Sequence, residues 1–338
     1  MDADIEVSVD VVRNLVRGQH ADLDGPLRLV ANGWDNAIFR LGSDLAVRVP
    51  RRRIAAALIE HEQRWLPELG PVLPIAIPAP VRIGRPSAEY PYPWTITAWI
   101  DGTVVTRVPV GERGVFAEQL AGFLNSLHRP APVDAPVNPV RGVALVARSE
   151  VMGERFRKLG ERFQPMGERF EMVTGRFDEV GGRFEGVGER FDGVGERFDG
   201  VGQRFEEVAE RGASGRIAQE LSELWNDLAA VSPWAGPPQW VHGDLHAANL
   251  LTGADGFLAA VLDFGDLTAG DPATDLAAGW LVFDAPARAR FRAALDVDED
   301  TWQRGRGWAL CMAAAIAVDV TGTPEMYAMA AHALREIR

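Results

Sequence analysis

Two short polar strings on either side of one predicted β-hairpin constrain this chain more than any other feature of its sequence. The first, V-H-G-D-L-H-A-A-N, occupies 241–249, and the second, V-L-D-F-G, occupies 261–265. Between them, an apolar run at 250–252, the turn signal Gly-Ala-Asp-Gly and a second apolar run at 257–262 predict two antiparallel strands. A fold for this chain must therefore bring the two strings together at one end of a hairpin.

The polar residues of the two strings are those that ATP-dependent phosphoryl transfer requires. Antiparallel pairing should place Asn249 beside Asp263, with Asp244 on the loop that leads into the hairpin. One carboxylate then orients the attacking hydroxyl and accepts its proton, while the asparagine and the other carboxylate hold Mg²⁺ against the triphosphate. We therefore expect Asp244 to be the catalytic base and Asn249 and Asp263 to be metal ligands. Either string alone would indicate an ordinary turn, but both strings in this order around one hairpin argue against that alternative.

These strings resemble the aminoglycoside phosphotransferase and choline-kinase-like branch of the protein-kinase fold. That branch carries His-Gly-Asp where protein kinases carry His-Arg-Asp, and Gly243 makes the same difference here. The stretch D-F-G-D-L-T-A-G-D-P-A-T-D-L-A at 263–277 also resembles the family, and outside the middle of the chain the similarity extends over 33–310. The resemblance implies an α+β, two-lobed kinase-like fold, with a small N-terminal antiparallel-sheet lobe and a larger, mainly helical C-terminal lobe. It also implies ATP or GTP and Mg²⁺ as cofactors.

The domain organisation expected from this resemblance has four parts. Residues 1–100 form the N-terminal nucleotide-binding lobe, and 101–150 form the hinge and the first part of the C-terminal lobe. Residues 151–212 are a heptad-repeat insertion, and 213–338 complete the catalytic lobe.

In the N-terminal lobe, apolar runs at 27–31, 37–41 and 45–49 predict three successive strands, and turn signals separate them. By resemblance, the first turn lies over the nucleotide phosphates. Gly33 would let the backbone approach them, and Asn36 could donate a side-chain hydrogen bond. A single glycine is equally consistent with an ordinary hairpin turn.

Composition decides which residue contacts the phosphates from the third strand. The only lysine in the chain is Lys158, far from this strand, so the cation here must be Arg48. Its planar fork can hold phosphate oxygens with a geometry different from that of an ammonium group. A helical pattern at 54–69 contains two candidate partners, Glu60 and Glu62, and the resemblance favours Glu62; a solvated glutamate is the alternative.

The last strand of the small lobe is expected at 94–100, where an apolar run ends at Asp-Gly. By resemblance, the backbone from Ala98 to Ile100 should meet the adenine. Apolar residues at helical spacing over 115–127 predict the first core helix of the large lobe.

Three further polar residues, His242, Asp271 and Asp275, are candidates for structural support of the site. Asp271 precedes Pro272 and suits a helix N-cap, while Asp275, in the first turn, should brace the catalytic loop. Capping and helix-dipole chemistry alone is the alternative for both. His242 and His246 are poor ligands for Mg²⁺, so we expect His242 to make a structural hydrogen bond.

A heptad repeat interrupts the family pattern. Phenylalanine recurs every seven residues from Phe156 to Phe205, always after an arginine, and an apolar residue follows each one by three positions, which is typical of a coiled-coil seam. The twelve glycines between 153 and 208 would cost an isolated helix roughly 12 kcal/mol, at ~1 kcal/mol each relative to alanine. We therefore expect a helix over most of 175–208 that packs on itself or on a second chain, with self-association through 153–208. A tolerated tandem expansion without function is the alternative.

Composition narrows the class of protein and partner. The formal net charge of −13 argues against a nucleic-acid-binding surface and mildly favours cationic small molecules. The single cysteine, Cys311, excludes a disulfide framework. No membrane-spanning run and no signal-peptide pattern occur, so the sequence predicts a cytoplasmic protein.

The function expected from the sequence is transfer of the γ-phosphoryl group of ATP or GTP to a hydroxyl of a small molecule. The resemblance is compatible with an aminoglycoside or macrolide antibiotic as the acceptor, and equally with an ordinary metabolite alcohol. The competing hypothesis is a non-catalytic kinase-like scaffold that self-associates through the heptads.

Overall fold

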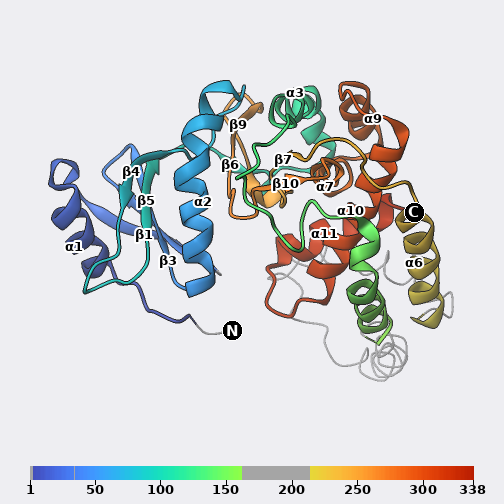
Figure 1. Cartoon of the computed structure of the whole chain (residues 1–338), viewed down its shortest axis with the longest axis horizontal. Helices are drawn as coiled ribbons and strands as arrows, with labels where there is room; N and C mark the ends of the chain where they lie inside the picture. The colour runs from blue at the N-terminus through green and yellow to red at the C-terminus, as the bar shows by residue number, and fades with distance from the viewer. Residues whose placement is uncertain (1–2, 34, 162–213) are drawn as a thin grey trace, which may run out of the picture.

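The computed structural model describes residues 3–33, 35–161 and 214–338, with only the backbone of 214–217. Figure 1 shows two lobes side by side: an N-terminal lobe built on a sheet, and a C-terminal lobe that is mostly helical. This is the α+β architecture expected from the sequence. Among the described residues, no helix combines the length and apolar character needed to cross a membrane.

The small lobe is built on a five-stranded antiparallel sheet with the order β1-β2-β3-β5-β4. Its strands are β1 (Leu27–Asn32), β2 (Asn36–Leu41), β3 (Leu45–Pro50), β4 (Pro80–Gly84) and β5 (Trp94–Ala98). Alternate residues of β2 are buried, as expected of a strand with one face on a core. Helix α1 (Val9–Gln19) covers that core with Val12, Leu15 and Val16, and the 3-10 helix η1 (Ala21–Leu23) follows it.

Helix α2 (Arg53–Leu69) joins the two lobes physically. Its buried face includes Glu62, which reaches the sheet, while Trp65 and Leu66 belong to the core of the large lobe. The 3-10 helix η2 (Gly70–Val72) leads into a segment that bonds the catalytic hairpin, since Val261 N donates to Ala76 O at 3.0 Å. Part of the predicted 1–100 lobe thus packs on the large lobe, since Leu73, Ile75 and Ile77 belong to the large-lobe core.

The predicted hairpin is present in the large lobe. Strands β8 (Leu250–Thr252) and β9 (Leu258–Val261) pair antiparallel, and β6 (Thr103–Val104) adds to the edge of β8. A second pair, β7 (Gln239–Val241) with β10 (Thr268–Gly270), flanks the loops on either side of the hairpin. Both polar strings therefore lie next to paired strands, which fixes their backbones.

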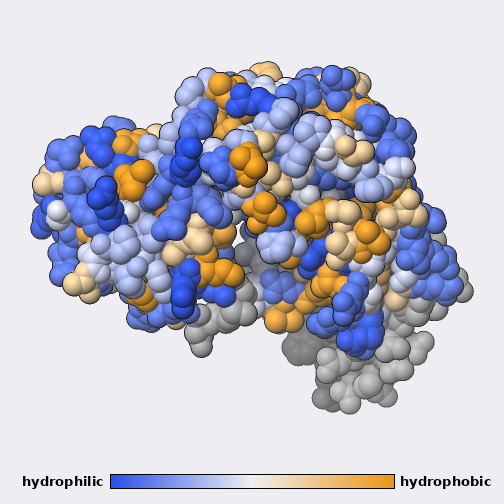
Figure 2. All heavy atoms as spheres, in the orientation of Figure 1, coloured by the Kyte–Doolittle hydropathy of each residue, from blue (hydrophilic) through white to orange (hydrophobic). Residues whose placement is uncertain are grey.

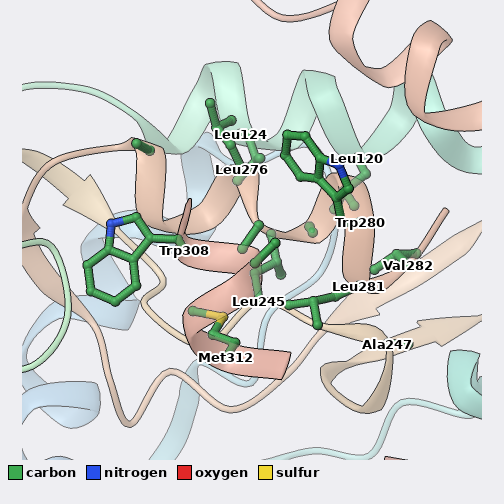
Figure 3. Packing of buried hydrophobic residues seen from close by; sticks show 14 of the residues in the cluster. Leu120, Leu124, Leu245, Ala247, Leu276, Trp280, Leu281, Val282, Trp308 and Met312 are labelled. Carbon is green, nitrogen blue, oxygen red and sulfur yellow. The ribbon is translucent and has the colours of Figure 1, made fainter. Parts of the chain in front are cut away.

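Helices form the rest of the large lobe and its core. In chain order they are η3 (Val105–Arg107), η4 (Val110–Phe116), α3 (Ala117–Leu127), η5 (Leu145–Arg148), α6 (Ser214–Ala229), η7 (Ala247–Asn249), α7 (Ala273–Leu276), α8 (Ala278–Leu281), α9 (Ala285–Ala293), α10 (Glu299–Val318) and α11 (Pro324–Glu336). Figure 3 shows Leu120 and Leu124 of α3 facing Leu276 and Trp280, with Trp308 of α10 on another side of the core. Because α10 is buried along most of its first sixteen residues, it anchors the lobe. On the face in Figure 2, hydrophilic residues cover most of the small lobe.

The first core helix of the large lobe begins later than predicted, and the first copy of the repeat packs differently from expectation. The helix predicted from residue 115 begins at Ala117, because the preceding turn is the 3-10 helix η4. Residues 149–161 are helical, and Met152, Phe156 and Leu159 lie in the large-lobe core. The first copy of the repeat therefore packs in the core of the large lobe. The helix expected over 175–208, and most of the segment expected to self-associate, lie outside the described residues.

Candidate active site

The loop after β7 carries the His-Gly-Asp string in a backbone conformation that needs its glycine. Gly243 has φ +87°, and a Cβ there would lie 2.5 Å from the backbone oxygen of Asp266. The fully buried carboxylate of Asp275 accepts hydrogen bonds from His242 N at 2.8 Å and from Gly243 N at 2.9 Å. This is the bracing contact that the sequence led us to expect of Asp275. A larger residue at position 243 would push the loop away from Asp266.

His242 and Asp271 support the loop through further hydrogen bonds. The Nε2 atom of His242 lies 2.9 Å from Leu262 O, and its Nδ1 atom accepts from Asp244 N at 3.2 Å, so the neutral tautomer carries its proton on Nε2. Asp271 Oδ1 accepts from Ala273 N at 3.0 Å at the start of α7, and Asp271 Oδ2 pairs with Arg304 Nε at 2.7 Å. The N-cap of α7 is Pro272 and not Asp271 as predicted, because Pro272 already has helical backbone angles. Asp271 lies one position earlier, where it accepts from the first helical N–H and forms a buried ion pair.

Asp244 points its carboxylate into a set of polar partners. Its Oδ1 atom lies 3.0 Å from Arg141 Nη2, and its Oδ2 atom lies 3.2 Å from His246 Nε2. Burial by itself would raise the pKa of Asp244, but the charges of His246 and Arg141 outweigh it and hold that pKa well below its usual range. The same pairing raises the pKa of His246 despite its burial. The carboxylate is therefore ionised and fixed in orientation.

Asn249 and Asp263 meet at the end of the hairpin, as the strand pairing predicts. Leu262 N donates to Asn249 O at 2.8 Å, and Asn249 Nδ2 donates to Asp244 O at 2.9 Å. No hydrogen bond within the described residues uses Asn249 Oδ1. Asp263 adopts φ +59°, and its side chain is 54% exposed. One amide oxygen and one exposed carboxylate are therefore available beside the candidate base.

This pair of oxygen donors fits Mg²⁺ in the way that nucleotide-dependent sites hold it. Mg²⁺ is usually bound through one or two carboxylates, with substrate phosphates and water completing its octahedron. Within the described residues, no group of three or more His, Cys, Asp or Glu side chains gathers as a self-sufficient metal site. Asn249 and Asp263 would thus hold the ion together with a triphosphate.

On the small-lobe side, Arg48 connects the sheet to this end of the hairpin. Its Nη1 atom lies 2.6 Å from Glu62 Oε1 and 2.8 Å from Oε2, and its Nη2 atom lies 2.9 Å from Asp263 Oδ1. Glu62 on α2, and not the exposed Glu60, is the partner. Burial would lower the pKa of Arg48, but the carboxylates of Glu62 and Asp263 raise it, so the guanidinium stays charged.

The first turn of the sheet is a tight hairpin held by hydrogen bonds. Gly33 N donates to Asn36 O at 3.0 Å, and Arg51 Nη1 donates to Gly33 O at 2.8 Å. With its amide oxygen facing Arg48, Asn36 accepts from Nη2 at 3.0 Å and from Nε at 3.2 Å. The side chain of Asn36 therefore lies on Arg48 in this structure and helps to orient it.

The segment between the lobes leaves the sheet at the expected place. Ala98 is the last residue of β5 and pairs with Leu45. Trp99 N donates to Asp44 O at 2.7 Å, and Ile100 follows outside the strand. The run predicted to end at residue 100 thus stops as a strand at Ala98, because Trp99 turns to bond the β2–β3 turn.

Comparison with known proteins agrees with this geometry. The sequence model described as the phosphotransferase enzyme family matches residues 26–308. The chain belongs to this family. The sequence itself matches none of the curated proteins compared with it.

Solved structures with the same fold include two kinds of antibiotic phosphotransferase. The phosphotransferase described here is similar to APH(2")-IIia in its complex with GDP and kanamycin, with a TM-score of 0.56, 18% identity, and coverage of 96% of this chain and 97% of that one. It is also similar to the apoenzyme of macrolide 2'-phosphotransferase MphH from Brachybacterium faecium, with a TM-score of 0.54, 20% identity, and coverage of 96% and 98%. The streptomycin–ATP–APH(2")-IIa ternary complex gives a TM-score of 0.51 at 15% identity, covering 91% and 90%. At these identities the likeness establishes the shared fold.

Sequence reasoning missed the residues that surround the base of this phosphotransferase. Arg141 does not stand out in any motif, and Asp266 belongs to the Asp-Phe-Gly-Asp string but received no role. The contact of Arg141 with Asp244 and Asp266 depends on how the chain folds. His246 was considered only as a poor metal ligand. Its position two residues after Asp244 on a tight loop was a local signal that the two side chains could pair.

Proposed function

We propose that this phosphotransferase moves the γ-phosphoryl group of ATP or GTP to a hydroxyl of a small molecule, with Asp244 as its catalytic base. The observation that carries the proposal is the cluster at the end of the β8–β9 hairpin. An ionised carboxylate, an amide oxygen and a second, exposed carboxylate lie together there, and the Arg48–Glu62 pair joins them from the small lobe. Each of these groups has a role in phosphoryl transfer, and none of them is needed to fill a core.

The chemistry of the base follows from its surroundings. The acceptor hydroxyl donates a hydrogen bond to Asp244, its oxygen attacks the γ-phosphorus, and the bond from that phosphorus to the β–γ bridging oxygen breaks. Because the pKa of Asp244 is held low, the carboxylate is a weak base toward an alcohol. Its contribution is therefore orientation until the new P–O bond forms. The hydroxyl then becomes acidic, and its proton passes to Asp244.

The other residues position the nucleotide. Arg48, fixed by Glu62 and Asn36, is placed to contact the phosphates, with Gly33 in the turn above them and the backbone from Ala98 to Ile100 beside the adenine. A bound Mg²⁺ supplies positive charge to the phosphates, and Asn249 and Asp263 would hold it.

The acceptor class proposed first is an aminoglycoside or a macrolide antibiotic. Structures with this fold include complexes of an aminoglycoside phosphotransferase with kanamycin and a macrolide 2'-phosphotransferase. The net charge of −13 is compatible with a cationic acceptor. A metabolite alcohol in the cytoplasm is the second candidate.

A non-catalytic scaffold is the alternative class of function. It would explain the heptads, but it gives no reason for an ionised carboxylate held between Arg141 and His246 next to the amide oxygen of Asn249 and the exposed carboxylate of Asp263. The retained cluster therefore favours catalysis.

A phosphoryl-transfer screen tests the proposal. The purified full chain is incubated with Mg²⁺ and γ-labelled ATP or GTP across aminoglycosides, macrolides and small alcohols, and labelled product is identified by mass. We expect one acceptor class to gain a phosphoryl group with stoichiometric ADP or GDP. Nucleotide binding without transfer to any acceptor, and without hydrolysis, would favour the scaffold.

A further inference from the structure

Arg141 reaches the candidate base from a loop that no motif marks. Its Nη2 atom lies 3.0 Å from Asp244 Oδ1, and its Nε atom lies 3.4 Å from Asp266 Oδ2. The side chain of Arg141 is only 20% exposed. One guanidinium therefore spans the carboxylate of the candidate base and the carboxylate of Asp266.

The loop that carries Arg141 is held by its own hydrogen bonds. Asn138 Oδ1 accepts from Val140 N at 2.9 Å and from Arg141 N at 3.2 Å. Asn138 Nδ2 donates to Asp266 Oδ1 at 2.8 Å, and Asn138 N donates to Thr268 Oγ1 at 2.8 Å. The turn is thus fastened to the segment that follows the Asp-Phe-Gly string.

Hydrogen bonds also hold the C-terminal end of this loop, at Gly142. Gly142 has φ +66°, Asp271 N donates to its oxygen at 2.9 Å, and its own nitrogen donates to Thr274 Oγ1 at 3.2 Å. A Cβ on Gly270 would lie 2.3 Å from Gly142 O, so the two backbones are in direct contact. None of these contacts uses the guanidinium of Arg141, and the loop should keep its shape without it.

Arg141 and His246 each pair with a different oxygen of the Asp244 carboxylate. Arg141 holds Oδ1 and His246 holds Oδ2, which fixes the plane of the Asp244 carboxylate. Each carboxylate oxygen has two lone pairs, so an acceptor hydroxyl can still donate to an oxygen that already has a partner. The arrangement orients the base without blocking it.

We propose that Arg141 is a positioning residue for phosphoryl transfer, which holds the Asp244 carboxylate in the orientation that receives the acceptor hydroxyl and is itself anchored by Asp266 and Asn138. This inference rests on the proposed function. Among the hydrogen bonds of the described residues, its guanidinium donates only to the carboxylates of Asp244 and Asp266, so we expect its removal to affect the base more than the fold. Asp266 keeps its bond from Asn138 when Arg141 is replaced.

Steady-state kinetics of Arg141→Ala and Arg141→Lys test the inference on the full chain, with the acceptor found in the screen. Displacing a reacting group by about 1 Å can cost ~10²-fold in rate. We expect kcat to fall by about that factor in Arg141→Ala while KM for the nucleotide stays unchanged, and Arg141→Lys to recover part of the loss. Asp266→Asn, which weakens the anchor, should give a smaller fall in kcat.

Chemical rescue separates positioning from folding. Guanidinium chloride, added at concentrations well below denaturing, should restore part of kcat in Arg141→Ala and none in Asp244→Asn. Arg157→Ala is the matched control, because Arg157 forms an exposed ion pair with Glu161 in the same lobe, at 2.5 Å. Its kcat should equal that of the wild type.

The outcomes distinguish this inference from the proposed function. A wild-type chain that transfers to no acceptor contradicts the proposed function. An active wild type whose Arg141→Ala variant keeps the wild-type kcat overturns the role of Arg141 alone. A loss of kcat in Arg141→Ala that guanidinium does not rescue, together with a nucleotide KM that rises in parallel, would also overturn it.

Discussion

At the scale of single residues, the carboxylate of Asp244 decides what the site can do. Its oxygens lie 3.0 Å from Arg141 and 3.2 Å from His246. Although burial acts in the opposite direction, these two charges hold the pKa of Asp244 well below its ordinary value. The candidate base is therefore charged throughout the neutral range, and in the proposed function the remaining residues of the site hold the cation and contact the phosphates.

Asp263 is the residue that should contribute most to Mg²⁺-dependent nucleotide binding. Asp263→Ala removes the anionic oxygen next to Asn249, so the affinity for nucleotide should lose its dependence on Mg²⁺. Calorimetric titration with a non-hydrolysable nucleotide, with and without Mg²⁺, measures this directly. Asp255→Ala, at the other end of the same hairpin, is the control and should bind as the wild type does. Unchanged Mg²⁺-dependent affinity in Asp263→Ala would remove it from the metal site.

Glu62 should affect kcat/KM for the nucleotide because it holds Arg48 in place. Glu62→Gln replaces a carboxylate that is 2.6 Å from Arg48 Nη1 by a neutral amide. Losing this charge-assisted hydrogen bond, at ~1.5–3 kcal/mol, should reduce kcat/KM for the nucleotide by roughly tenfold or more. Glu60→Gln, exposed on the same helix, should leave it unchanged. Equal effects of the two substitutions would contradict the role given to Glu62.

At the scale of elements, local sequence predicted those parts of the site that lie close together along the chain. The hairpin brought Asn249 to Leu262 and Asp263 because strand pairing is dictated by two apolar runs and a turn. The contact of Arg141 with Asp244 joins residues 103 positions apart. No periodicity encodes such a contact, since it depends on the packing of the 138–142 loop on β10.

The first copy of the heptad repeat shows a similar limit. Its spacing predicted a helix but not the partner of that helix. Phe156 and Leu159 enter the large-lobe core, where they are 2% and 1% exposed. The same heptad spacing elsewhere in the chain would predict the same apolar stripe, because the spacing does not say what the stripe packs on.

The conformation of the loop that carries Asp244 depends on one glycine, Gly243. Gly243→Ala would place a Cβ 2.5 Å from Asp266 O at φ +87°. We expect it to lower the free energy of unfolding by at least ~1–2 kcal/mol and to displace Asp244, with a fall in kcat. Thermal unfolding and steady-state kinetics measure the two effects. Gly122→Ala in α3, where a Cβ would contact nothing within 4 Å, should be neutral or slightly stabilising. A Gly243→Ala chain as stable and active as the wild type would contradict this reading of the loop.

At the scale of the whole molecule, the site is assembled from both lobes. Arg48 and Glu62 come from the small lobe, and Asp244 and Asp263 come from the large one. The 73–77 segment and helix α2 pack on the large-lobe core, so the two lobes share a boundary on which the Arg48–Asp263 ion pair depends.

Residues 162–213 contain most of the repeat and none of the candidate site residues. Replacing them by a short glycine-serine linker should leave phosphoryl transfer unchanged. The excision must stop at residue 162, because Met152, Phe156 and Leu159 belong to the core. Rates of transfer and the molar mass in solution, measured for both chains, check this prediction and the expected self-association together. A variant that folds and binds nucleotide but transfers no phosphoryl group would place the repeat in the acceptor site.

The most direct test of the account compares the wild type with Asp244→Asn in single-turnover phosphoryl transfer from a γ-labelled nucleotide to the acceptor. Asparagine keeps the size of the side chain but removes the charge that we propose orients and deprotonates the hydroxyl. We predict that the rate of transfer falls by roughly 10²-fold or more, at the scale of general-base contributions, while nucleotide affinity stays nearly unchanged. A wild-type rate of transfer in Asp244→Asn would contradict the proposed role of Asp244 as the catalytic base.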